Sequence, residues 1–172
     1  MSSVMTPVDP AAMRDVMGRF ATGVAVVTAE HDGGPHGMTV NSLTSVSLDP
    51  PLLLVCLNTG ARSTEAIIAS GRFAVNILSA RQEHLARRFA ERGADHFAGL
   101  SVAYGRHRVP IIPDAYARLE CDVDRHFVAG DHVVVIGAVR EVSAREGEPL
   151  GFLGGKFSDI VDRGREPVEW FF

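Results

Sequence analysis

Polar residues of the kinds that bind small molecules gather in two short segments just before the apolar run 52–57. These segments are Thr39-Val40-Asn41-Ser42 and Ser45-Val46-Ser47. Because side chains alternate along a strand, Ser45 and Ser47 are expected to share one side of the sheet. Thr39 and Asn41 are expected to share another side for the same reason. Such rows of hydroxyl and amide groups predict the wall of a binding cleft, and a solvated face of turn-forming residues is the alternative.

The segment Asn58–Thr64 stands between that apolar run and a helix-like stretch. Its end, Arg62-Ser63-Thr64, combines one guanidinium and two hydroxyls with the free N–H groups of a helix start, which suits a phosphate ester. Ser63 is equally well placed to cap the helix. Glu65 suits the helix dipole but repels an anion on the same side. The segment predicts a phosphate site, with helix capping as the alternative.

A further segment, Gly130-Asp131-His132, joins two long strand patterns and is the strongest hairpin signal in the chain. A histidine at the rim of a barrel can contact a bound heterocycle or donate a proton to it. The alternative is a plain hairpin turn with a polar residue entering the strand.

Several function classes are disfavoured by composition and by missing motifs. Seventeen Lys+Arg against twenty-one Asp+Glu give a net charge of −4, which does not attract nucleic acid. The P-loop, Rossmann, zincin and nucleophile-elbow motifs are absent, and no histidine pair has metal-binding spacing, so no metal is expected. Cys56 and Cys121 are expected to be inert core residues. Without a signal-peptide pattern or a run of about 18 apolar residues, we expect a cytoplasmic protein without a membrane span.

The elements that must position these segments are short strands, hairpins and interspersed helices. Asp9-Pro10 opens an amphipathic helix, and Gly71 is expected to end the helix that begins near Ser63. Residues 95–114 predict a long excursion over the surface. Because no βαβ rhythm occurs, the pattern predicts one domain over residues 1–172, a closed or half-closed antiparallel barrel decorated by helices.

Four stretches, taken in order, resemble one known family. They are MRDVMGRFATGVAVVTA, GMTVNSLTSVSLDPPLLLVCLN, ARSTEAIIASGRFAVNIL and GDHVVVIGAV. Together they are similar to the flavin reductase family, which supplies reduced flavin to two-component monooxygenases. The resemblance runs from about residue 13 to about residue 158, nearly the whole chain.

This resemblance implies an FMN-binding split barrel, a mainly β fold built on a six-stranded antiparallel Greek-key barrel with added helices. It also implies a homodimer with a flavin site near the interface. Hydride would pass from NADH or NADPH to N5 of FAD or FMN, and the reduced flavin would leave for a separate monooxygenase. Because the cofactor does the chemistry and the protein orients the two rings, no catalytic dyad or triad is required.

The resemblance also implies roles for the polar segments. Thr39-Val40-Asn41-Ser42 matches the segment beside the isoalloxazine and ribityl chain, and Ser45-Val46-Ser47 matches the adjoining strand. Arg62-Ser63-Thr64 matches the phosphate end. His132 matches a histidine associated with the nicotinamide. Phe157 falls where relatives often have an aromatic residue, commonly Tyr, near the stacked rings.

Two departures and several alternatives accompany this interpretation. Phe157 lacks the hydroxyl of Tyr, so a hydrogen bond from that position is in doubt, and Leu43 stands where many relatives carry Phe. The alternatives are a non-catalytic flavin carrier or sensor on the same barrel, a pyridoxamine-phosphate oxidase-like enzyme, and an oligomeric β-barrel module without a cofactor. The sequence leaves open FAD against FMN, NADH against NADPH, and the identity of the partner oxygenase.

Overall fold

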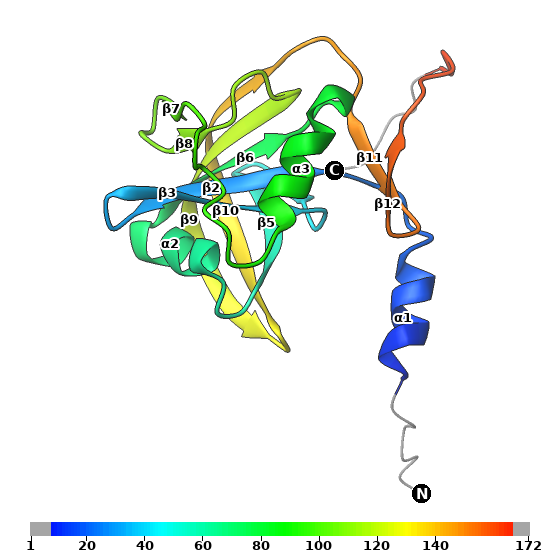
Figure 1. Cartoon of the computed structure of the whole chain (residues 1–172), viewed down its shortest axis with the longest axis horizontal. Helices are drawn as coiled ribbons and strands as arrows, with labels where there is room; N and C mark the ends of the chain where they lie inside the picture. The colour runs from blue at the N-terminus through cyan, green and yellow to red at the C-terminus, as the bar shows by residue number, and fades with distance from the viewer. Residues whose placement is uncertain (1–7, 167–172) are drawn as a thin grey trace, which may run out of the picture.

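The computed structural model describes residues 8–166, which form a mainly β fold (Figure 1). Within this range the main sheet is antiparallel and has seven strands in the order β3-β2-β6-β9-β10-β5-β4. Their bounds are β2 Ala25–His31, β3 Gly34–Val40, β4 Thr44–Leu48, β5 Pro51–Asn58, β6 Arg72–Ile77, β9 Ala117–Ala129 and β10 His132–Ala144. The smaller strands are β1 Thr22–Gly23, β7 Ala103–Tyr104, β8 Pro110–Ile111, β11 Leu150–Leu153 and β12 Lys156–Asp159. The expected mainly antiparallel β fold with added helices is confirmed.

The main sheet curls because its two edge strands, β3 and β4, are consecutive in the chain. Ser42, in the short connection between them, fastens this connection to β5. Its hydroxyl donates to the carbonyl of Cys56 at 2.9 Å and accepts the N–H of Cys56 at 3.0 Å. The two ends of the sheet are thereby drawn together into a half-closed barrel, with β4 added to the six strands expected.

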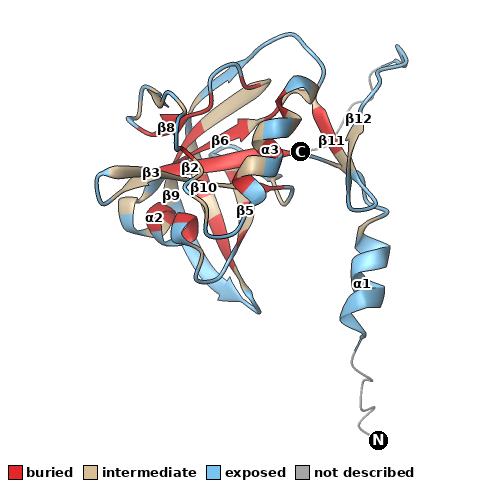
Figure 2. Ribbon diagram, in the orientation of Figure 1, coloured by how far each residue is buried: buried red, intermediate tan, exposed pale blue. Residues whose placement is uncertain are grey.

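The hydrophobic core fills the inside of this curled sheet (Figure 2). On β5, Val55 and Leu57 point inward and are fully buried. Leu54 and Cys56 point to the outer face and stay partly exposed, because no helix packs on this side of β5 in residues 8–166. Cys121 is buried as expected, but the expectation that Cys56 is a core residue was wrong.

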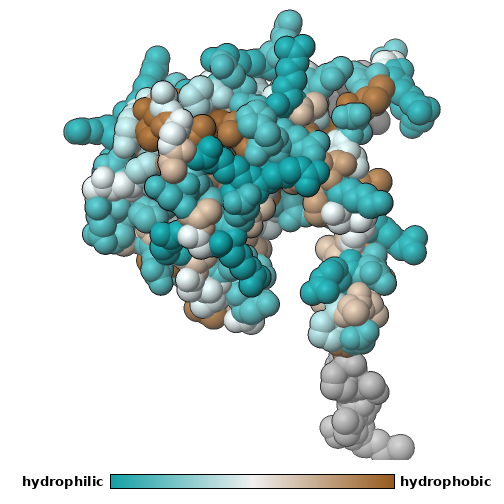
Figure 3. Space-filling view, in the orientation of Figure 1, coloured by the Kyte–Doolittle hydropathy of each residue, from teal (hydrophilic) through white to brown (hydrophobic). Residues whose placement is uncertain are grey.

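Two helices flank the edge of the sheet at β3, and one helix stands apart. Helix α2 (Arg62–Ser70) packs on β2 and ends at Gly71, whose φ of 68° is the left-handed C-cap that the sequence predicts. The single turn η1 (Ala80–Gln82) leads into α3 (Glu83–Ala90), which packs on β3. Helix α1 (Pro10–Met17) is capped by the carboxylate of Asp9, as predicted, but projects from the body with none of its residues buried (Figures 1 and 2). No described helix is long and apolar enough to cross a membrane, and the face shown in Figure 3 is mostly hydrophilic.

The excursion 95–114 is tied to the outer face of the sheet by three buried polar side chains. Thr28 donates to the carbonyl of Pro110, and Asn76 accepts the N–H of Ile112 at 2.9 Å. Glu120, which is fully buried, accepts the N–H of His107 at 2.8 Å. Because these contacts satisfy backbone groups of the excursion, it is a fixed part of the fold.

The predicted hairpin at Gly130-Asp131 joins β9 and β10, the two longest described strands, and Gly130 adopts a φ of 63° there. His132, the first residue of β10, lies opposite Asn58, the last residue of β5. The N–H of Thr59 also donates to the carbonyl of Asp131 at 3.1 Å. The hairpin is therefore held beside the turn that leads from β5 into α2.

Candidate functional site

A cavity of about 610 Å³ opens at the outer edge of β3. Four segments line it: residues 35–39 of β3, residues 58–63 at the start of α2, the end of α3, and residues 91–97. Three residues expected at the site, Thr39, Arg62 and Ser63, are among the lining residues. The fold thus brings two of the four predicted polar segments, 39–42 and 58–64, to one cavity.

The start of α2 presents unpaired backbone donors to this cavity. Gly60, with a φ of 74°, turns the chain, and Ala61 is the extended N-cap residue. The N–H of Thr64 bonds back to the carbonyl of Ala61 at 2.9 Å, whereas those of Arg62 and Ser63 have no backbone partner in residues 8–166. Free N–H groups together with the positive end of a helix dipole attract an anion.

Ser63 does not cap α2, so that alternative was wrong. The turn at Gly60 places the N-cap at Ala61, two residues before Ser63, so Ser63 is the second helical residue, and Ala61 has no side chain able to cap. Ser63 is 7% exposed, and within residues 8–166 its hydroxyl has no hydrogen-bond partner. Thr64 instead donates to the carbonyl of Asn58 at 2.9 Å and fastens the turn. Ser63 is a largely buried residue, but its hydroxyl is not among the fully buried unpaired polar atoms, so it reaches the cavity surface and is free to bind a ligand.

The predicted hydroxyl row on β4 is broken by a β-bulge. Ser45 pairs with Leu53, whereas Ser47 pairs with Leu52, and the extra residue is Val46. Paired residues share a face of the sheet, but Leu52 and Leu53 are neighbours and point to opposite faces. Ser45 and Ser47 therefore lie on opposite faces, and the expectation that they share one was wrong.

The segment 39–42 also departs from simple alternation, because β3 ends at Val40. The hydroxyl of Thr39 donates to the carbonyl of Ala86 at 2.7 Å and ties β3 to α3. The side chain of Val40 is 7% exposed and belongs to the core, whereas Asn41 is exposed beyond the strand. Because the hydroxyl hydrogen of Ser42 is committed to Cys56, only its remaining lone pair can meet a ligand.

His132 lies outside the cavity, on the outer face of the sheet. Its ring is 39% exposed, and Nδ1 lies 2.7 Å from a carboxylate oxygen of Asp131. The hydrogen bond from this ring, and then the charge of the ring, lower the pKa of the Asp131 carboxyl. When Nδ1 donates to Asp131, Nε2 is left to face a ligand.

Residues 17–160 match the model of the flavin reductase like domain, and this span includes every element that lines the cavity. The chain belongs to the flavin reductase like domain family. The resemblance found from the sequence is confirmed. Several relatives and solved neighbours are named flavin reductases.

A probable flavin reductase of Rhizobium meliloti (strain 1021) is 48% identical over 147 residues, which cover 85% of this chain. The chain spans about half the length of that relative, 46% of it. Reductase subunit HsaB of a flavin-dependent monooxygenase from Mycobacterium tuberculosis (strain H37Rv) is 39% identical, over 95% of this chain and 89% of that protein. The structure of Streptomyces globisporus C-1027 NADH:FAD oxidoreductase SgcE6 in complex with NAD and FAD fragments matches with a TM-score of 0.86 and 37% identity. That match covers 95% of this chain and 100% of the other chain, and the split-barrel fold class is confirmed.

In this flavin reductase like domain, Phe157 stands apart from the cavity. It meets Phe152 edge to face at a ring distance of 5.7 Å, and the guanidinium of Arg87 lies 5.0 Å from its ring centroid. Phe157 is not among the residues that line the cavity. Its expected place near the stacked rings stays a prediction.

Sequence reasoning missed His96 as a residue of the cavity wall. The ring nitrogens of His96 lie 2.9 Å from the carbonyl oxygen of Gly37 and 2.7 Å from that of Glu91. The residue stands at the start of the excursion 95–114, where no periodicity indicates its neighbours, and its contact with Gly37 spans 59 positions. A histidine followed by a phenylalanine in a loop is a weak signal in the sequence, and the packing of both rings against Phe89 becomes visible only in the structure.

Proposed function

We propose that this chain is the reductase component of a two-component monooxygenase system, oxidising NADH or NADPH and passing reduced flavin to a separate oxygenase. A bound flavin supplies the redox chemistry by accepting a hydride at N5 from the nicotinamide. The chain's own groups bind and orient the two rings. Membership of the flavin reductase like domain family and the names of its relatives support this function.

The observation that carries the proposal is the start of α2. Ser63 lines the cavity with a hydroxyl that has no hydrogen-bond partner in residues 8–166, and the N–H groups of Arg62 and Ser63 belong to the same wall. The guanidinium of Arg62 is held in the wall by a hydrogen bond to the carbonyl of Ala94 at 2.8 Å. Hydroxyl, backbone N–H and guanidinium groups together fit the phosphate of a flavin nucleotide.

His132 is the residue that we propose to orient the nicotinamide. Its bond to Asp131 fixes the ring, and its register position opposite Asn58 places it beside the turn that opens α2. A hydrogen bond from Nε2 to the carboxamide would set the approach of the hydride donor. The ring positions the substrate in this account, and no proton transfer from His132 is required.

The test is steady-state oxidation of NADH and of NADPH by the purified protein, with FMN or FAD added and the nicotinamide absorbance recorded. We expect flavin-dependent oxidation above the rate without protein. If the protein binds flavin but oxidises neither nicotinamide, it is a flavin carrier and the reductase proposal is wrong.

We also propose that the protein is a homodimer. Helix α1 and the chain just after it expose four large apolar side chains, each at least 55% accessible: Met13, Val16, Met17 and Phe20. An isolated helix of eight residues is not stable in water, so it needs a surface to pack on. The outer face of β9 and β10 offers one, with Phe127 53% exposed and Leu54 on the neighbouring β5 partly exposed. A second copy with two-fold symmetry would cover both apolar surfaces.

Light scattering during gel filtration tests the dimer, with Phe20→Asp as the variant and Arg19→Asp as the neighbouring control. We expect dimers for the wild type and for the control, and monomers for Phe20→Asp. A monomeric wild type contradicts the proposal.

A cytoplasmic location stays part of the proposed function, because NADH and NADPH are available there.

A further inference from the structure

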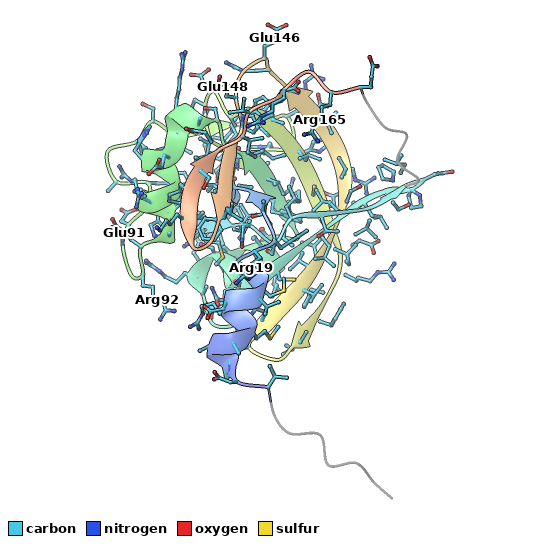
Figure 4. All side chains as sticks on the ribbon, turned by 90° about the vertical axis from the view of Figure 1, so that its right-hand side faces the viewer. Arg19, Glu91, Arg92, Glu146, Glu148 and Arg165 are labelled. Carbon is cyan, nitrogen blue, oxygen red and sulfur yellow. The ribbon has the colours of Figure 1, made fainter. Side chains whose placement is uncertain are left out.

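Helix α3 contacts both segments that are expected to border the flavin and nicotinamide rings, one at the end of β3 and one on β12. The carbonyl of Ala86 accepts the hydroxyl of Thr39 at 2.7 Å. The next residue, Arg87, places its guanidinium 5.0 Å from the centroid of the Phe157 ring. Figure 4 shows α3 beside the hairpin of β11 and β12. Two consecutive residues of one helix therefore link β3 to β12.

The guanidinium of Arg87 is held over this ring by Glu83, one turn earlier on α3. A carboxylate oxygen of Glu83 accepts Nε of Arg87 at 2.8 Å and Nη2 at 2.6 Å. Glutamate four residues before a cationic residue is the favourable order on a helix. The side chain of Arg87 is 66% exposed, and an ion pair at such a site stabilises a fold very little. What the pair does here is keep the guanidinium on the face of the aromatic ring, where a cation is attracted.

The ring of Phe157 depends on Arg87 because its strand lies at the edge of a small sheet. In residues 8–166, β12 pairs only with β11, in the sheet β1-β11-β12. The ring packs at the margin of the hydrophobic cluster around Phe89 and stays partly exposed. Phe152, which it meets edge to face, belongs to the same hairpin. The guanidinium of Arg87 is thus the charged contact that anchors this ring to α3.

We propose that Arg87 is a positioning residue for hydride transfer, which keeps the ring of Phe157 at a fixed place beside the flavin and the nicotinamide. The inference rests on the proposed function, because it takes the two rings to lie between the end of β3 and Phe157. Hydride transfer requires the reacting atoms in near contact, so a small displacement of a bordering side chain lowers its rate. Arg87 acts on the rings through Phe157 in this account.

The experiment measures the rate of single-turnover reduction of FMN by NADH, without oxygen, in the wild type, Arg87→Met, Arg87→Lys and Arg81→Met. Methionine keeps an unbranched side chain and removes the charge. We expect Arg87→Met to slow hydride transfer roughly two- to fivefold, the factor that corresponds to an exposed cation–π contact, and to leave the Kd for FMN within about twofold. Arg87→Lys should restore most of the rate, because lysine makes the same contact. Arg81, an exposed arginine of η1, is the matched control, and Arg81→Met should change neither quantity.

A double variant shows whether Arg87 acts through the ring of Phe157. In a Phe157→Leu background the guanidinium has no ring to hold, so adding Arg87→Met should slow hydride transfer no further. Equal slowing by Arg87→Met in both backgrounds overturns the inference.

The alternative is that Arg87 only stabilises α3 through its ion pair with Glu83. In that case Arg87→Met lowers the free energy of unfolding in urea but reduces FMN at the wild-type rate, and the inference is wrong. A wild type that reduces FMN while Arg87→Met matches its rate refutes the inference alone. A wild type that reduces neither FMN nor FAD refutes the proposed function, and the inference with it.

Discussion

Replacing Ser63 with alanine separates ligand binding from helix stability. The hydroxyl of Ser63 has no hydrogen-bond partner in residues 8–166, so its removal from the ligand-free protein breaks no hydrogen bond. We expect the free energy of unfolding to change by less than about 0.5 kcal/mol, whereas the loss of a true N-cap costs about 1 kcal/mol. Flavin binding should suffer more, because a hydrogen bond to a charged phosphate contributes about 1.5–3 kcal/mol.

That range corresponds to a roughly 10- to 150-fold rise in the dissociation constant of FMN. Quenching of flavin fluorescence measures it, and urea denaturation measures stability on the same preparations. Ser70→Ala is the matched control: Ser70 lies at the other end of α2, where its hydroxyl donates to the carbonyl of Ala66 at 2.7 Å. This control should leave FMN affinity unchanged. A Ser63→Ala protein with lower stability and unaltered FMN affinity would refute the phosphate site.

Three further variants or reactions test other parts of the account. His132→Ala should raise the KM for the nicotinamide and slow hydride transfer while flavin affinity stays the same; unchanged nicotinamide kinetics in the folded variant would remove His132 from the site. Gly37→Ala should lower the free energy of unfolding by about 1–3 kcal/mol, because the new Cβ would lie 2.7 Å from the ring of Phe89. Gly34→Ala on the same strand meets no atom within 4 Å and should be nearly neutral in the same urea titration. Burial and, to a smaller extent, nearby carboxylates raise the pKa of the Cys121 thiol to about 12. At pH 8 an alkylating reagent should therefore leave Cys121 unmodified until the protein unfolds, which mass spectrometry of the peptide that contains it would show. Rapid labelling of Cys121 in the folded protein would contradict this.

Local features of the fold were predictable from the sequence because neighbouring residues determine them. The Asp9 cap, the left-handed Gly71 and the Gly130-Asp131 hairpin each depend on a few adjacent residues, and all three are confirmed. The expected N-cap of α2 was two residues too late, because the turn at Gly60 and not the nearest hydroxyl decides where the helix begins. A hydroxyl residue cannot act as the N-cap when the backbone begins the helix before it, as happens to Ser63.

The arrangement of the site depended on contacts that alternation does not reveal. A bulge of one residue at Val46 reverses the faces of Ser45 and Ser47, and nothing in the local sequence marks it. The wall at His96 is brought to Gly37 by the packing of the excursion 95–114, over 59 positions of the chain. The family resemblance singled out Arg62-Ser63-Thr64, of which Arg62 and Ser63 line the cavity, but gave no indication of that wall.

The central claim is that this chain brings a reduced nicotinamide and a flavin together for direct hydride transfer. Anaerobic mixing of the protein and stoichiometric flavin with NADH deuterated at the transferred C4 position, and with unlabelled NADH, tests it most directly. The account predicts that, with FAD or FMN, the oxidised-flavin absorbance disappears at the same rate as NADH is oxidised. Both rates should be lower with the deuterated NADH. Flavin that keeps its oxidised absorbance with both NADH and NADPH, although it is bound, would contradict the claim.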